Sequence, residues 1–66
     1  MPGISFYRKQ NNLTQQELAG LLGVPRATLA MWETSRAWPP SSILPIIAEL
    51  LNCTIEELYH NPAESI

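Results

Sequence analysis

The side chains that most often carry out catalysis or bind metals are scarce in this chain of 66 residues. There is one cysteine, Cys53, and one histidine, His60. A lone cysteine forms no internal disulfide, and one cysteine with one histidine does not supply a set of metal ligands. Glu56 and Glu57 are adjacent carboxylates, but they lie in the first turn of a predicted helix, where capping accounts for them. The sequence therefore predicts no active site, metal site or cofactor, and we expect a protein that is not an enzyme.

The basic side chains limit the chemistry further. Four lysine and arginine residues stand against six aspartate and glutamate residues, which gives a net charge of −2 at pH 7. The sequence pI is about 5.1. Such a chain has no general attraction for polyanions, which excludes a protein that coats nucleic acid through charge alone. Any contact with a polyanion must come from a few basic residues at particular positions.

Length and composition predict a single folded domain over residues 1–66. The chain is 45% hydrophobic and 15% charged, which lies outside the range typical of disordered chains. No apolar run approaches the roughly 20 residues that span a bilayer, and the N-terminus lacks the pattern of a signal peptide. We therefore expect a cytoplasmic protein that does not contact membranes and takes no small-molecule ligand.

Short helices must position the polar side chains. A first helix is predicted over residues 4–11, and the two asparagines at positions 11 and 12 are expected to end it. A second is predicted over residues 15–22. Thr14 and Glu17 form a capping box at its start, because each can hydrogen-bond the backbone N–H of the other, and Gly23 provides a left-handed end.

The next two helices are bounded by prolines and serines. Pro25 favours the start of a third helix over residues 26–34, because its fixed φ suits a first helical position. A fourth helix is predicted to run to Leu51. Either serine of the pair 41–42 can cap it, and Ser42 is favoured because it places Pro45 at the third helical position, within the first turn.

A fifth helix completes the prediction. Thr54 and Glu57 form a second capping box, and the helix is expected to run through His60. The tail, residues 61–66, is expected to be frayed. The pattern as a whole predicts an all-α fold of five short helices.

The second and third predicted helices are joined by a tight turn, which is the spacing of a helix-turn-helix motif over residues 14–34. The string LTQQELAGLLGVPRATLAMWE closely resembles the DNA-binding family of Cro and the phage repressors, also called XRE-type. The matching residues are Leu13, Thr14, Gln15, Glu17, Leu18, Ala19, Gly23, Val24, Trp32 and Glu33, with Leu29 in place of an isoleucine. The resemblance extends through IIAELLN and TIEEL, so it covers nearly the whole chain and implies a fold like that of the lambda repressor DNA-binding domain.

The resemblance assigns roles to individual residues. It implies a partly buried structural ion pair between Arg8 and Glu33. In a helix-turn-helix protein the second helix of the motif lies in the major groove, and the residues left on its outer face would read the bases: Arg26, Ala27, Thr28, Ala30 and Met31. Arg26 is the strongest candidate, since bidentate arginine to guanine is the commonest specific contact, whereas the other side chains offer a hydroxyl or apolar contact to thymine methyl groups.

Contacts to the DNA backbone are expected at both ends of the motif. The family position of Gln15 holds a phosphate at the start of a helix, where free N–H groups also attract anions. The predicted phosphate contacts are Thr14, Gln15, Thr34 and Arg36. The chain departs from the family at Ser35, where a glycine is usual, and a left-handed conformation there would cost about 1 kcal/mol.

The leading hypothesis is a sequence-specific transcriptional regulator, expected to be a repressor, that binds a double-stranded operator as a homodimer. The expected apolar dimer or partner surface comprises Trp38, Ile43, Tyr59 and Ile66. The rival hypothesis is a helix-turn-helix scaffold that binds another protein, like an antitoxin, and has little affinity for DNA. The acidity of the chain and the Trp38-Pro39-Pro40 loop favour this rival, because an exposed tryptophan beside two prolines is typical of a protein contact.

Overall fold

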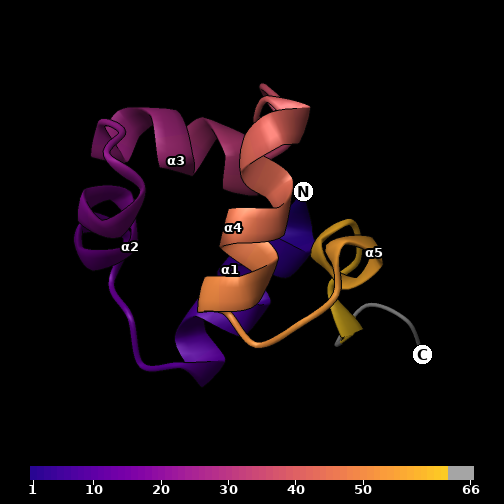
Figure 1. Cartoon of the computed structure of the whole chain (residues 1–66). Coiled ribbons are helices and arrows are strands. Elements are labelled where there is room, and N and C mark those ends of the chain that lie inside the picture. Colours follow the sequence, from indigo (N-terminus) through magenta and orange to yellow (C-terminus); the bar gives the residue numbers. More distant parts are fainter. Residues whose placement is uncertain (63–66) are drawn as a thin grey trace.

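The computed structural model describes residues 1–62, and all regular structure in that range is helical (Figure 1). The helices are α1 (Pro2–Gln10), α2 (Gln15–Leu22), α3 (Arg26–Glu33), α4 (Leu44–Leu50) and α5 (Ile55–Leu58), and a 3-10 turn, η1 (Ser41–Ile43), precedes α4. Figure 1 shows α2 and α3 on one side of the molecule, α5 on the other, and α1 and α4 between them. The predicted all-α fold class is confirmed.

A single apolar core holds the helices together. Every helix contributes at least one buried side chain to it, and the buried members are Met1, Ile4, Leu18, Ala19, Leu29, Trp32, Ile47, Ala48, Leu51 and Leu58. The longest helix, α1, has nine residues. Isolated helices shorter than about 12–15 residues are marginal in water, so each of these helices depends on the core for its stability.

Helix α2 has the predicted bounds because its signals are local. The Thr14 hydroxyl accepts from the Glu17 N–H at 3.0 Å, and a Glu17 carboxylate oxygen accepts from the Thr14 N–H at 2.9 Å. Gly23 ends the helix in the left-handed region with φ 72°. This conformation directs the Val24 N–H to the Ala19 carbonyl at 3.0 Å and begins the turn into α3.

Helix α1 differs from its prediction at both ends. It begins at Pro2 instead of Ile4, since proline suits the first helical turn, and it ends at Gln10. The extra turn places Gly3 in the interior against α5. Arg8 in this helix is only 8% exposed.

The later helices also differ from their predictions. Pro25 is the extended residue before α3, and Thr34 is the C-cap after it, so α3 is one residue shorter than expected. Ser42 does not cap α4: residues 41–43 form η1 after Pro40, and neither serine makes a side-chain cap bond. Pro45 is therefore the second residue of α4, and α5 ends at Leu58 instead of His60.

The side chain of Asn11 joins the end of α1 to the end of α4. Its amide nitrogen donates to the carbonyl oxygens of Tyr7 at 2.8 Å and Leu51 at 2.9 Å. Its own oxygen accepts from the Asn52 side chain at 3.1 Å. The Tyr7 carbonyl also accepts from the Asn11 backbone N–H at 3.1 Å, so the new contact that this amide makes between the two helix ends is the one to the Leu51 carbonyl.

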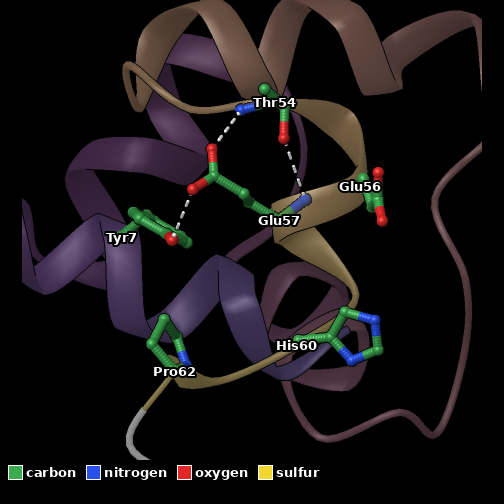
Figure 2. Close-up of a pocket in the computed structure, with 6 residues that line it drawn as sticks. All are labelled: Tyr7, Thr54, Glu56, Glu57, His60 and Pro62. Carbon is green, nitrogen blue, oxygen red and sulfur yellow. Dashed lines mark hydrogen bonds between the residues drawn. The ribbon is translucent and has the colours of Figure 1, made fainter. Parts of the chain in front are cut away.

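Helix α5 is attached through Glu57 (Figure 2). The Glu57 carboxylate accepts from the Thr54 backbone N–H at 2.8 Å, which completes the predicted capping box, and from the Tyr7 hydroxyl at 3.0 Å. Figure 2 shows the carboxylate lying between these two donors. These hydrogen bonds, with the Thr54 N–H as the larger cause, lower the pKa of Glu57 below its ordinary value of 4.5.

The lowered pKa predicts how stability depends on pH. A carboxyl whose pKa is lower in the folded state stabilises the fold fully above its unfolded pKa, and the contribution is lost as the pH falls through the folded pKa. Thermal unfolding of Glu57→Gln, which keeps an acceptor oxygen but does not titrate, should therefore show a smaller fall in Tm between pH 6 and pH 3 than the wild type. Glu56→Gln is the matched control, and equal falls in all three proteins would contradict the prediction.

Candidate nucleic-acid interface

The outer surface of α3 is defined by the residues that the helix buries. Leu29, Trp32 and Glu33 face the interior. The five predicted base-reading residues are not among these buried side chains. Of these, Arg26, Ala27 and Met31 are exposed, whereas Thr28 and Ala30 are half-buried.

The Arg8–Glu33 ion pair is present and well enclosed. Arg8 Nε lies 2.7 Å from Glu33 Oε2, and the two side chains are 9% and 5% exposed. A second guanidinium nitrogen of Arg8 lies 3.3 Å from Glu33 Oε1, and the third donates to the Leu13 carbonyl at 2.7 Å. This arginine links α1, the loop before α2 and the end of α3, so it is not available to DNA.

Gln15 connects the buried ion pair to the surface of α3. Its amide nitrogen donates to Glu33 Oε1 at 2.9 Å, and its amide oxygen accepts from Arg26 Nη1 at 3.1 Å. Because a carboxylate only accepts, Glu33 fixes which way the amide points and presents the amide oxygen to Arg26. The first residue of α2 thus orients the first residue of α3. The sequence pattern did not indicate this contact.

Two predicted phosphate contacts differ in what their hydroxyl groups can do. The Thr14 hydroxyl accepts a hydrogen bond from the Glu17 N–H, so its own proton is free to donate at the N-terminus of α2. The Thr34 hydroxyl already donates to the Ala30 carbonyl at 3.0 Å. Thr34 would have to break this bond before it could donate to a phosphate.

The turn after α3 returns the chain toward that helix. Ser35 adopts φ 63°, so the left-handed conformation is kept here although serine stands in place of the usual glycine. The Arg36 N–H then bonds to the Met31 carbonyl at 2.9 Å. The Arg36 side chain is exposed and makes no hydrogen bond or ion pair within residues 1–62. It lines a shallow hollow of about 440 Å³ together with Ala30, Met31 and Thr34.

The predicted dimer surface is only partly exposed. Trp38 is 60% exposed and Tyr59 is 43% exposed, and their rings lie side by side with centroids 6.0 Å apart. Ile43 is half-buried and packs against the core, so less of its side chain is exposed than expected. Ile66 lies outside the described residues. The apolar side chains of Leu21 and Ile46 are also more than half exposed. The sequence pattern did not indicate these two as exposed contacts.

A second hollow, of about 390 Å³, is lined by Tyr7, Thr54, Glu56, Glu57, His60 and Pro62 (Figure 2). The Glu57 carboxylate at this hollow already accepts hydrogen bonds from the Thr54 backbone N–H and from the Tyr7 hydroxyl. Burial, with a smaller effect of Glu57, raises the pKa of the nearby Cys53 thiol.

Residues 1–62 contain no group of three or more potential metal ligands, and none of their helices is long and apolar enough to cross a membrane.

Comparison with known proteins agrees with this geometry. Residues 4–58 match the family described as helix-turn-helix. The chain is 37% identical over 51 residues to the HTH-type transcriptional activator BcrR of Enterococcus faecalis, and 42% identical over 41 residues to Repressor protein C of Escherichia phage P2. It is also 34% identical over 56 residues to an uncharacterized HTH-type transcriptional regulator of Methanocaldococcus jannaschii.

The three matches differ in how much of each protein they cover. The aligned region is 77% of this chain but 25% of the activator, and 62% of this chain but 41% of the repressor. For the archaeal regulator it is 85% of both chains. No solved structure matches the chain significantly.

Proposed function

The chain belongs to the helix-turn-helix family, and from this premise we propose that it is a transcriptional regulator that binds a DNA operator with α3 in the major groove. The observation that carries the proposal is the hydrogen bond from Arg26 to Gln15, which positions an exposed guanidinium at the N-terminal end of α3. In helix-turn-helix proteins this end of the helix contacts base edges.

Arg26 is the proposed reader of a guanine. Arginine can donate two hydrogen bonds to guanine O6 and N7. The bond to Gln15 uses one of its five N–H groups and leaves the others for a base. Because Gln15 is itself held by Glu33, part of the ordering of this long side chain precedes binding, which reduces the entropic cost of the contact.

The phosphate contacts are proposed to come from the start of α2 and the turn after α3. Thr14 and the unpaired first N–H groups of α2 supply donors at one end, and Arg36 supplies a cation at the other. The Gln15 amide donates one of its two N–H groups to Glu33, and the other is the group that would donate to a phosphate. Few cations take part, so we expect weak non-specific binding and a shallow salt dependence.

A homodimer would compensate for this weak backbone affinity. Two subunits related by a two-fold axis would place their α3 helices in successive major grooves, about 10 base pairs apart. Support for a contact surface comes from the exposed Trp38 and Tyr59 rings, which join the loop after α3 to α5. We propose a repressor that acts in the cytoplasm, where operator binding alone would block transcription.

Selection from a library of random duplexes tests the proposal. We expect an enriched motif, and Arg26→Ala should weaken binding to it about 10- to 100-fold and relax the preference at one base pair. Arg36→Ala should weaken all duplexes equally and lower the salt slope by about 1. Lys9→Ala, an exposed cation on α1, is the control and should change neither quantity. Failure to enrich any motif at low salt would contradict sequence-specific binding.

The exposed Trp38 and Tyr59 pair also favours the second candidate, a protein-interaction module. In that case Trp38→Ala would abolish partner binding, Arg26→Ala would not, and the interaction would change little with salt. Operator binding would instead be reduced by Arg26→Ala, and it would weaken as salt rises with the modest slope that its few cations give, because phosphate counterions return.

A further inference from the structure

We propose that the hollow beside the C-terminal half of α3 receives the C5-methyl group of a pyrimidine, either thymine or 5-methylcytosine. This inference rests on the proposed operator binding and extends it by naming the second base that the site reads. The hollow has a volume of about 440 Å³ and is lined by Ala30, Met31, Thr34 and Arg36. It lies further along α3 than Arg26, toward the end of the helix.

The floor of the hollow is apolar. Met31 is a large hydrophobic side chain that is 43% exposed, and Ala30 beside it is half-buried. Neither side chain has a hydrogen-bonding group that could satisfy a polar base edge. An apolar group placed against Met31 would remove its exposed surface from water, which is favourable in proportion to the area covered.

The polar groups around the hollow are already engaged. The Thr34 hydroxyl donates to the Ala30 carbonyl. The backbone N–H groups of residues 34–37 all donate to carbonyls of α3, at 2.9–3.4 Å. The remaining hydrogen-bond donor at the hollow is the Arg36 guanidinium, which lies after the helix and is the proposed phosphate contact.

These features select among the bases. Every base presents polar groups on its major-groove edge that Ala30 and Met31 cannot satisfy, and thymine O4 is one of them, so the property that distinguishes the bases at this hollow is an apolar group on that edge. Thymine is the base that places a methyl group on this edge. Cytosine methylated at C5 carries the same methyl group and should be accepted in the same way.

The spacing along α3 predicts where this pyrimidine lies in the operator. Met31 is five residues beyond Arg26, which corresponds to about 7.5 Å along a helix axis. Successive base pairs are about 3.4 Å apart. The methyl group should therefore be read at a base pair no more than about three steps from the guanine that Arg26 contacts.

The experiment uses the duplex selected by the protein. Each thymine is replaced singly by uracil, which lacks only the methyl group, and the Kd of each duplex is measured. One thymine per half-site should show a loss of about fourfold, which corresponds to burial of one methyl group at about 0.8 kcal/mol. At that position a 5-methylcytosine duplex should bind about fourfold more tightly than the unmethylated cytosine duplex.

Protein variants assign the effect to the hollow. Met31→Ala should bring the ratio of thymine to uracil affinity close to one, whereas Arg26→Ala should weaken binding but keep the ratio. Unchanged circular dichroism would show that both variants fold. The inference is overturned if every thymine tolerates uracil or if Met31→Ala leaves the ratio unchanged, and in both cases guanine-dependent binding would still support operator recognition. If no duplex is enriched at all, the proposed function fails and this inference fails with it.

Discussion

Replacing Glu33 by alanine should lower the free energy of unfolding by about 3–5 kcal/mol, because it leaves the buried guanidinium of Arg8 without its partner. The loss is a large part of the stability of a small domain, which is typically about 5–15 kcal/mol. The amide of Gln15 loses an acceptor as well. Urea unfolding followed by circular dichroism measures the change.

Two further variants define the cause. Glu49→Ala removes an exposed carboxylate from α4 and should change the stability by less than about 0.5 kcal/mol. The double variant Arg8→Met with Glu33→Leu removes both charges, and it should be considerably more stable than Glu33→Ala, since apolar replacement of a buried pair is often neutral. If the single and double variants were equally unstable, packing volume and not the unpaired charge would explain the loss.

Gly3→Ala should destabilise the protein by about 3 kcal/mol, at the upper end of the cost of overpacking a core. A Cβ atom at Gly3 would lie 2.7 Å from the His60 carbonyl oxygen and closer still to that of Glu57. Both are backbone atoms, which cannot rotate away as a side chain can, so α1 and α5 must separate. The change is measured by thermal and urea unfolding.

Gly20→Ala is the matched control for this substitution. Nothing lies within 4 Å of a Cβ built at Gly20, which is an exposed residue in the interior of α2. Alanine there should stabilise the protein by about 1 kcal/mol, because glycine is a poor helix former. Equal effects at both glycines would show that helix propensity, and not the α1–α5 contact, determines the outcome at Gly3.

The site could be predicted only in part. The ion pair of Arg8 and Glu33 and the exposed face of α3 followed from the family resemblance and from the positions of Leu29 and Trp32. The bond from Arg26 to Gln15 did not, because it depends on the angle and distance at which α2 crosses α3. The same is true of the side-by-side arrangement of Trp38 and Tyr59, which are far apart in the sequence.

What the sequence determined by itself was the local structure of the motif. The capping boxes that begin α2 and α5, and the left-handed turn at Gly23, involve residues no more than about five positions apart, so residue type alone specifies them. The packed core decided the rest: the start of α1 at Pro2, the partial burial of Ile43 and the hydrogen-bonded path from Arg8 to Arg26. The reason is physical: capping acts within a single helical turn, whereas a contact between distant residues exists only once all the helices have packed together.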